Sequence, residues 1–446
     1  MRRFTTLEYV RACVKAAAVA PAFLRRPFRD ASAYREYQTR RVARLIRHAY
    51  TRTPFYRNKY DEAGVTPDDF HELHDLARFP TTTKEELIEA IVAGTLGTQG
   101  GIESVSSGSS GKIITVTHRP SDTHAYAVGR FRILNMTGVL RPWDRTLYVY
   151  TSEFPARSLF GLYPSRFVST LNDLRDSIRR IRALRPRVLC IYPSRLLEMA
   201  AMLDAPSASA LGLALISVNS ETSSPEQRSA MAEHFGCPVL EEYSTEELGW
   251  TATECAFRTL HIWEDMVRLE TLDSDVDVAT RPGDVGEIVG TNLHNFATPF
   301  IRYRQGDLGS IHDVTCECGR TFRALEHLVG RKNDAFHFDS GSVSPAYLLD
   351  SIYSLVLDHS LPISDFCLLK ETRNHVTFQF ASRRRDASPG LTQAIERHLA
   401  PLFPPGVTVR AHPTAQMYKT VTGKRNPIVS LVSRRQPETH HEPARI

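Results

Sequence analysis

The pattern of apolar and polar positions predicts a helical N-terminal part. Within residues 31–60 apolar side chains recur at helix spacing among many arginines, and the proline-containing stretch 51–54 ends the pattern. A second helix is expected over residues 84–91, where a preceding threonine can cap the first turn and Glu85 and Glu86 suit its positive end. Residues 1–80 are therefore expected to form a helical layer, followed by this helix and a sheet.

Short β-rich apolar runs alternate with helices in the middle of the chain. Strands are predicted over residues 113–117, 147–150, 188–192 and 213–218, and helices near 121–136 and over 171–184. Such alternation is typical of a parallel sheet covered by helices. Further strands are expected at residues 286–290 and 299–304, the second leading directly into Gln305, Gly306 and Asp307.

A change of pattern near residues 330–334 predicts a domain boundary. Beyond it, strands such as 376–380 alternate with helices such as 391–399, and residues 433–446 form a polar tail that we expect to be disordered. The predicted fold class is α/β. A large N-terminal domain, residues 1–330, would hold mixed or parallel sheets with flanking helices, and residues 335–432 would form a small α+β domain.

Composition narrows the function classes. The 446 residues, 42% of them hydrophobic, are enough for a large core and more than one domain. With 55 basic and 50 acidic residues the formal net charge is +5, and the absence of a basic stripe interleaved with aromatics argues against a nucleic-acid partner.

The sequence also bears on location. No uninterrupted apolar run approaches the roughly 20 residues of a transmembrane helix. Arg11 and Lys15 interrupt the apolar N-terminal segment, which predicts an amphipathic surface helix rather than a secretory signal. The seven cysteines, an odd number with several isolated, fit a reducing cytoplasm best.

The stretch of residues 106–112 is the first candidate for chemistry. It combines two glycines with four serines and ends in a lysine, so its N–H groups and hydroxyls can converge on a phosphate. A P-loop would require glycine at position 106 and serine or threonine at position 113, where this chain has Ser106 and Ile113. On these residues alone, a different phosphate-binding loop and a flexible surface linker both remain open.

Polar clusters follow two of the predicted strands at their carboxyl ends. Asn219, Ser220 and Glu221 follow one strand, and residues 243–247 follow the next. Because ligands of parallel sheets collect at this edge, both clusters are candidate binding residues.

Five motifs in order resemble the adenylate-forming superfamily of acyl-CoA synthetases, and within it the phenylacetate–CoA ligase family and its capsule-biosynthesis-like relatives. The motifs are residues 106–112, 243–247, 303–307, 330–331 and 422–425, and the resemblance spans roughly residues 35–430. The stretch 47–57 also resembles the family's helix-and-turn opening. The resemblance implies a two-domain enzyme with a hinge at residues 331–334 and a mobile C-terminal lid.

The resemblance further implies an ATP site. The loop would close over the β- and γ-phosphates with Ser106, Ser107, Gly108, Ser109, Ser110, Gly111 and Lys112. Ser220 and Glu221 would line the adenine, and Tyr243, followed by Ser244, would stack on it.

At the sugar, Asp307 would accept hydrogen bonds from both ribose hydroxyls, since an ionised carboxylate is a bidentate acceptor. A turn-capping aspartate is the alternative for this residue. Arg331 would also reach the nucleotide, although Asn333 stands where the family usually has Asp or Lys.

Two residues carry the implied catalysis. Lys424 would lie between the acid's carboxylate and the α-phosphate and stabilise the charge that develops there, while Lys419 is a nearby decoy. Glu247, four residues after Tyr243, would hold Mg²⁺ as a carboxylate ligand. Glu246 stands where the family usually has Ser or Thr, so it remains a competitor for the metal.

The cysteines give a separate metal signal. Cys316 and Cys318 belong to a tight C-x-C turn, and Cys255 and His261 precede it in the sequence. Three thiolates and one imidazole would complete a closed tetrahedral structural Zn²⁺ site, and the family resemblance favours it. Reduced, unliganded thiols are the alternative.

The sequence says less about the residues that would bind the acid. Tyr150 and Phe154 lie where relatives place aromatic walls of the acyl pocket, yet core packing explains them equally well. The implied reaction activates an aryl or related carboxylic acid with ATP and Mg²⁺, releases pyrophosphate and passes the acyl group to coenzyme A. Transfer to a carrier protein or an amine stays open, as do a non-catalytic nucleotide-binding descendant and a homodimer.

Overall fold

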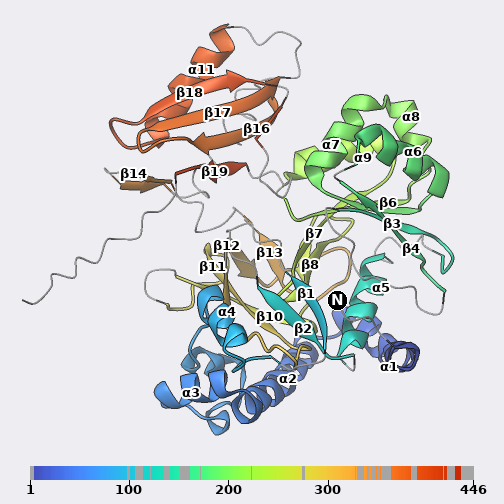
Figure 1. The fold of residues 1–446 in the computed structure, drawn as a ribbon, viewed down its shortest axis with the longest axis vertical. Coiled ribbons are helices and arrows are strands. Elements are labelled where there is room, and N and C mark those ends of the chain that lie inside the picture. Colours follow the sequence, from blue (N-terminus) through green and yellow to red (C-terminus); the bar gives the residue numbers. More distant parts are fainter. Residues whose placement is uncertain are drawn as a thin grey trace, which may run out of the picture. The chain divides into compact units, whose positions relative to one another are not determined.

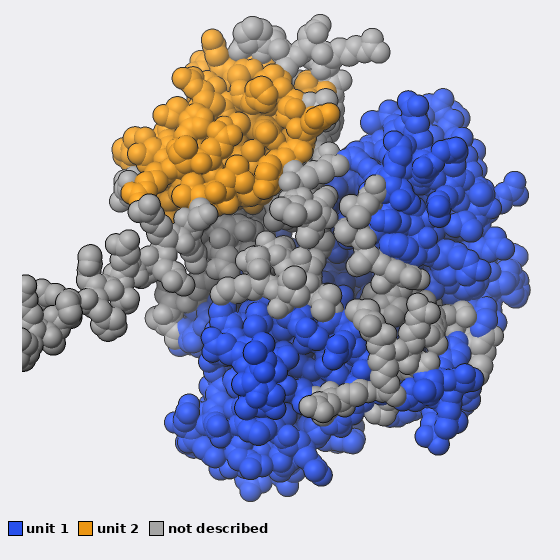
Figure 2. All heavy atoms as spheres, viewed as in Figure 1, with its two compact units in different colours: residues 1–328, 420–424 blue, residues 329–419, 425–446 orange. Residues whose placement is uncertain are grey.

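The computed structural model describes residues 5–97, 101–105, 114–120, 122–134, 141–150, 161–170, 172–221, 223–273, 277–326, 328, 336–338, 341–343, 348, 352, 363–382, 389–414, 416–418 and 427–432. These residues fall into two compact units, one up to Leu328 and the other from Phe336 onwards (Figure 2). Each unit has its own hydrophobic core.

The N-terminal part is helical, as predicted. The helices are α1 (Thr6–Arg25), α2 (Ala31–Arg52), α3 (Pro54–Glu62) and α4 (Lys84–Val92), and the 3₁₀ turns η1 (Arg26–Phe28), η2 (Pro67–Asp69) and η3 (Leu73–Arg78) lie between them. Thr83 caps α4 by accepting the Glu86 N–H, and the Glu86 carboxylate accepts the Thr83 N–H in return. The expected threonine cap is therefore confirmed.

One sheet dominates the large unit (Figure 1). Its strand order is β10-β11-β12-β13-β9-β8-β7-β6-β5-β3-β4. The parallel half contains β3 (Thr146–Tyr150), β4 (Ser165–Ser169), β5 (Val188–Ile191), β6 (Leu215–Asn219) and β7 (Val239–Thr245). The antiparallel half contains β8 (Gly249–Glu254), β9 (Leu260–Ile262), β10 (Val267–Leu272), β11 (Gly286–Asn292), β12 (Tyr303–His312) and β13 (Ala324–Glu326).

Strand β7 joins the two halves. It pairs in parallel with β6 and antiparallel with β8, so the chain reverses direction immediately after it. Residues near the end of β7 consequently lie both at the carboxyl edge of a parallel sheet and at the start of a hairpin.

Helices cover one face of the parallel half. They are α6 (Leu174–Leu184), α7 (Pro193–Met202), α8 (Ala205–Ser209) and α9 (Pro225–Phe235), drawn in green in Figure 1. Leu189, Ile216 and Val218 project from the strands into a cluster with Ile181 and Phe235 of these helices. Strands that are apolar on both faces need such cover, and the α/β class predicted from their alternation with helices is confirmed.

Three further elements lie beside this sheet. Strands β1 (Ile102–Val105) and β2 (Thr115–His118) form an antiparallel pair, and α5 (Thr123–Leu134) follows them. The Trp250 indole N–H on β8 donates to the carbonyl of Tyr126 in α5 at 3.0 Å, which ties the helix to the sheet.

The predicted strand at residues 299–304 starts too early, because β12 begins only at Tyr303. Several backbone groups before it bond to side chains. Tyr56 Oη donates to the Pro299 carbonyl at 3.1 Å and accepts the Ile301 N–H at 3.0 Å, and Thr82 Oγ1 donates to the Ile301 carbonyl at 3.1 Å. The apolar run therefore packs as a buried loop between helices and sheet.

The smaller unit is α+β. Its sheet has the order β18-β17-β16-β19, with β16 (Ile363–Lys370), β17 (His375–Ser382), β18 (Thr408–Pro413) and β19 (Ile428–Ser430). Helix α11 (Pro389–Leu399) contributes Ile395 and Leu399 to the core, next to Phe378 and Phe380. The strands β14 (Phe336–Phe338) and β15 (Gly341–Val343) form a separate pair.

Among the described helices, none has both the length and the apolar character required to cross a bilayer. Helix α1 is amphipathic as expected, with Cys13, Ala16 and Phe23 buried and Arg11 and Lys15 exposed.

A buried turn holds the N-terminal helices on the sheet. Asp265, fully buried between β9 and β10, accepts two hydrogen bonds from the Arg132 guanidinium of α5 at 2.8 and 2.7 Å and one from Arg26 at 3.0 Å. Its neighbour Glu264 accepts hydrogen bonds from Gln38 of α2 and from Arg323, at 2.5 and 2.6 Å. These two acids thus connect α2, α5 and the segment after α1 to one turn.

Substitution Asp265→Ala should destabilise the large unit by about 3–5 kcal/mol, because it leaves two arginines buried without their partner. The matched control is Asp313→Ala, which removes an exposed ion pair with Arg35 and should cost less than about 1 kcal/mol. Urea unfolding followed by tryptophan fluorescence measures both. Equal losses for the two variants would show that the buried cluster does not anchor the helices.

Candidate functional site

The predicted nucleotide residues from two distant motifs meet at one point. Tyr243 lies on β7 and Asp307 on β12, and the Tyr243 hydroxyl donates to Asp307 Oδ2 at 2.7 Å. Three strands separate β7 from β12 in the sheet order, so these residues would be about 19 Å apart in a flat sheet. The hydrogen bond therefore requires a strongly curled sheet.

A bulge in β12 aims Asp307 at this position. Glu287 pairs with Leu308 and Val289 with Arg304, so the single residue Ile288 stands opposite the three residues 305–307. Gly306 takes φ +80°, a conformation that glycine adopts without strain. The motif is therefore part of a bulge inside β12, which continues beyond the end predicted at residue 304.

The hairpin between β7 and β8 carries the two candidate magnesium ligands. Glu246 and Glu247 lie in its three-residue loop, which closes at Gly249 with φ +73°. Glu247 is buried, and its Oε1 accepts a hydrogen bond from Tyr303 at 3.1 Å. Glu246 is only half-buried.

A lysine from another element reaches Glu247. Lys84 is the first residue of α4, and its Nζ lies 3.7 Å from Glu247 Oε1. We did not predict this contact, although the sequence held a signal. A lysine in the first turn of a helix opposes the positive end of the helix dipole, so helix stability does not explain its place there.

The predicted adenine segment follows β6. Ser220 has φ +66°, and its hydroxyl donates to Asn219 Oδ1 at 3.1 Å. The Glu221 carboxylate accepts the N–H and the hydroxyl of Ser194 at 2.9 and 3.1 Å, at the start of α7. Glu221 therefore stabilises the N-terminal turn of a helix in addition to any role toward a ligand.

Two predicted residues, Ser244 and Tyr150, meet around a carboxylate that we did not predict. Ser244 Oγ donates to Glu242 Oε1 at 2.9 Å. Asn219 Nδ2 donates both to the same oxygen at 3.2 Å and to the Tyr150 hydroxyl at 2.6 Å. Tyr150 stacks on Tyr192 with ring centroids 5.1 Å apart, and burial raises the pKa of its phenol.

Other predicted site residues lie outside the described residues. They are the loop Ser106, Ser107, Gly108, Ser109, Ser110, Gly111 and Lys112, together with Phe154, Arg331 and Lys424. The predicted hinge at residues 331–334 lies outside them as well.

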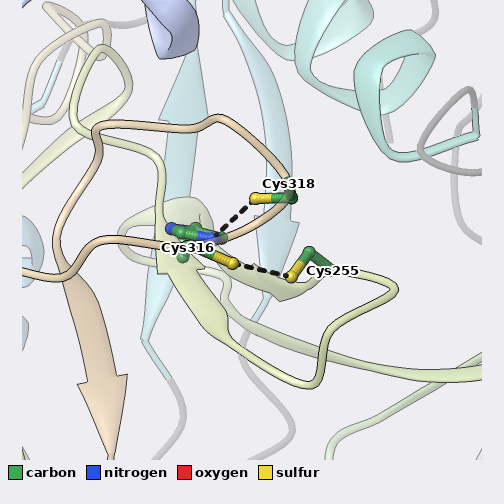
Figure 3. A group of neighbouring side chains, drawn as sticks. Cys255, Cys316 and Cys318 are labelled. Atoms are coloured by element: carbon green, nitrogen blue, oxygen red, sulfur yellow. Dashed lines mark hydrogen bonds between the residues drawn. The ribbon is translucent and has the colours of Figure 1, made fainter.

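The predicted cysteine–histidine group is brought together in the structure (Figure 3). Cys255 follows β8, His261 lies on β9, and Cys316 and Cys318 belong to the loop between β12 and β13. The four candidate ligand atoms all lie within 4.8 Å of one another. The Cys255 and Cys316 sulfurs are 3.7 Å apart, and the Cys318 sulfur is 3.2 Å from His261 Nε2.

Local contacts set the chemical state of this group. His261 Nδ1 lies 3.0 Å from the Phe322 carbonyl, which can only accept, so Nδ1 carries the proton and Nε2 faces Cys318 with its lone pair. Burial lowers the pKa of His261 and keeps the ring neutral. Burial also raises the pKa of Cys255 to about 11, so this group is a thiol unless a cation stabilises the thiolate.

The turn that carries the two sulfurs of the C-x-C motif is tight, as predicted. The Gly319 N–H donates to the Cys316 carbonyl at 2.9 Å, and Gly319 takes φ +76°.

Known proteins resemble this chain in sequence and in fold. Phenylacetate-coenzyme A ligase of Escherichia coli (strain K12) is 29% identical over 333 residues, which cover 71% of this chain and 75% of that ligase. The ligase of the same name from Thermus thermophilus is 28% identical over 326 residues, covering 70% of this chain and 73% of the relative. No protein-family model matches the chain.

A solved structure confirms the fold. The crystal structure of 2-hydroxyisobutyryl-CoA ligase in the postadenylation state, in complex with R3-HIB-AMP, superposes with a TM-score of 0.74 at 17% identity and covers 91% of each chain. At this identity the similarity speaks for the fold alone. Together, the sequence and structure comparisons confirm the predicted resemblance to phenylacetate–coenzyme A ligases among the adenylate-forming enzymes.

Proposed function

We propose that this chain, a relative of the phenylacetate–coenzyme A ligases with the fold of the adenylate-forming enzymes, is an ATP-dependent acid–coenzyme A ligase. The observation that carries the proposal is the hydrogen bond between Tyr243 and Asp307, next to the contact of Tyr303 with Glu247. Residues from both nucleotide motifs thereby converge at the carboxyl edge of the sheet, where such sheets bind ligands.

The first half-reaction forms an acyl-adenylate. A carboxylate oxygen of the acid attacks the α-phosphorus of ATP, and the bond from this phosphorus to the bridging oxygen breaks, so that pyrophosphate leaves with its electron pair. In the second half-reaction the coenzyme A sulfur attacks the acyl carbon. AMP leaves, and the thiol proton passes to solvent.

Asp307 and Tyr243 hold the nucleoside. The Asp307 carboxylate is half-buried and can accept bonds from two adjacent hydroxyls, which suits the ribose. The Tyr243 hydroxyl fixes this carboxylate, and the ring of the same tyrosine offers a face for the adenine. Ser220 and Glu221 follow β6, the strand next to β7, at the same edge of the sheet.

Glu247 is the residue we assign to Mg²⁺. Its carboxylate is buried, accepts a hydrogen bond from Tyr303 and lies beside the Lys84 ammonium, and carboxylate oxygens are ligands that Mg²⁺ prefers. When bound, Mg²⁺ would neutralise charge on the ATP phosphates. Lys84 orients the carboxylate, and Glu246 remains the alternative ligand.

The remaining assignments rest on the family resemblance. We assign phosphate binding to the loop of residues 106–112, a nucleotide contact to Arg331 and the adenylation step to Lys424. Residues 1–330 would form the adenylation domain and residues 335–432 a mobile lid that moves about residues 331–334. A cytoplasmic location fits the seven cysteines, an odd number.

We propose a structural Zn²⁺ on Cys255, His261, Cys316 and Cys318. Thiolates at about 2.3 Å from a tetrahedral zinc lie about 3.8 Å from one another. The Cys255–Cys316 sulfur separation of 3.7 Å matches this edge. Four protein ligands leave no position for water, so the ion would hold the β8–β9 and β12–β13 loops together rather than take part in the reaction.

Acid-dependent exchange of labelled pyrophosphate into ATP tests the first half-reaction. Across aryl and aliphatic acids, at least one should support exchange, and Lys424→Ala should lower the rate by on the order of 100- to 1000-fold, since it removes positive charge from the transition state. Lys419→Ala is the matched control and should keep the rate. Product analysis with coenzyme A as sole acceptor separates this ligase from enzymes that use a carrier protein or an amine. If no acid supports exchange in the unmodified protein, the proposal fails.

The two glutamates of the hairpin can be separated by the same assay. Glu247→Gln should lower exchange on the order of 100-fold and raise the Mg²⁺ concentration needed for half-maximal rate, because an amide is a weaker magnesium ligand. Glu246→Gln should change neither by more than about threefold. If Glu246→Gln lowers exchange and Glu247→Gln does not, Glu246 is the metal ligand instead.

If zinc occupies this site, elemental analysis of protein purified without chelators should find about one zinc ion per chain. Cys318→Ser should lose most of the metal and lower the unfolding temperature, since the two loops lose their link. Cys237→Ala, which alters a cysteine of the helix-covered core, should keep the metal. If the unmodified protein contains no metal and is nevertheless stable, the four residues are unliganded thiols and an imidazole, and the zinc proposal is wrong.

A further inference from the structure

Glu242 is a buried acid whose role the reaction above leaves unexplained. It lies on β7 directly before Tyr243, and alternation along the strand turns the two side chains to opposite faces. Its Oε1 accepts bonds from Ser244 and Asn219 at 2.9 and 3.2 Å, and its Oε2 accepts one bond from Ser217 at 3.3 Å. All these partners are neutral, and Oε2 keeps capacity for a further donor.

This environment sets Glu242 apart from the other buried acids in the described part of the large unit. Most of them face a cation: Glu247 faces Lys84, Glu254 faces Arg228 and Arg258, Glu264 faces Arg323, Asp265 faces Arg132 and Arg26, and Glu287 faces Arg304. Asp75 and Glu221 accept backbone N–H groups at the starts of helical turns. Only Glu242, within these described residues, has neither kind of compensation.

The preceding residue on the same strand offers a close comparison. Glu241 is turned to the other face, where its carboxylate lies 2.8 Å from the Arg228 guanidinium. Burial raises the pKa of both carboxyls to about 7, but at Glu241 the arginine opposes that rise, whereas at Glu242 only hydroxyl and amide groups do. An acid buried in this way costs stability and is typical of a functional site.

The surroundings of Glu242 point to the substrate end of the site. Tyr150, a predicted wall of the acyl pocket, is the last residue of β3, and Asn219 is the last residue of β6. One amide connects them, because Asn219 Nδ2 donates to the Tyr150 hydroxyl and to Glu242. Tyr192 stacks on Tyr150. All four residues thus lie at the carboxyl ends of neighbouring parallel strands.

We propose that Glu242 binds the end of the substrate distant from the reacting carboxylate, and that the substrate carries a hydroxyl or amino group there as a hydrogen-bond donor. The proposal rests on the proposed function, since it names the class of acid that the ligase activates. Oε2 accepts the donor, while Ser244 and Asn219 hold Oε1 in place. An acid with an apolar end would leave this carboxylate buried without the added partner, which disfavours its binding.

Matched pairs of acids in the pyrophosphate exchange assay test the proposal. The panel contains phenylacetate and benzoate, each compared with its ortho, meta and para hydroxyl and amino derivatives. For at least one derivative we expect kcat/KM about ten- to hundredfold above that of the parent acid, because a site built to bond a donor discriminates strongly against its absence.

Variants then assign the preference to Glu242. Glu242→Gln, which keeps the shape, should lower the ratio of derivative to parent about tenfold, and Glu242→Leu should bring it to about one or below. Glu241→Gln, its neighbour on the opposite face, should leave the ratio unchanged. A ratio is insensitive to partial loss of folded enzyme, so a merely structural role for Glu242 would not alter it.

The outcomes separate the two proposals. If the unmodified enzyme activates parent acids at least as well as all their derivatives, or if the Glu242 variants keep the ratio, the inference is wrong while the ligase function stands. If no acid supports exchange at all, the proposed function is wrong and this inference falls with it.

Discussion

The contact between Tyr243 and Asp307 constrains the whole large unit. The two residues are on strands that three others separate, so their 2.7 Å hydrogen bond can form only if the sheet curls through β8, β9 and β13. Two irregularities support this contact, the bulge at residues 305–307 of β12 and the shift in pairing at Tyr243 and Ser244 between β7 and β8. Bulges bend and twist strands, which makes this curvature compatible with continuous hydrogen bonding.

Buried charges fix the parts that surround this curled sheet. Asp265 and Glu264 bind arginines and a glutamine from the N-terminal helices and α5, so the turn between β9 and β10 holds these helices to the sheet. The cysteine–histidine group brings the loops after β8 and before β13 next to His261 of β9. Glu247 and Lys84 add a connection from α4 to the hairpin that follows β7.

The same strand, β7, separates two kinds of chemistry. Tyr243 is turned to the side where Asp307 and the antiparallel half lie, and Glu242 to the side where Ser217, Asn219 and Tyr150 gather. This division follows from the period of two along a strand. In the proposed function and the further inference, one strand would therefore contribute both to nucleotide binding and to the choice of acid.

Much of the fold could be predicted from local patterns. The α/β alternation, the capped start of α4 and the tight turn at Cys316 depend on residues within a few positions of one another, and the structure has them as expected.

The motif at residues 303–307 was also visible, but its conformation was not. Whether residues 299–302 join a strand depends in part on Tyr56 and Thr82, which lie more than 200 positions earlier and bond to the backbone of Pro299 and Ile301. The contact of Lys84 with Glu247 and the neutral surroundings of Glu242 likewise depend on long-range pairing. Sequence spacing determines which side chains a strand turns to each face, whereas the charge and the partner that each side chain meets there come from distant segments, which only the packed tertiary structure brings into contact.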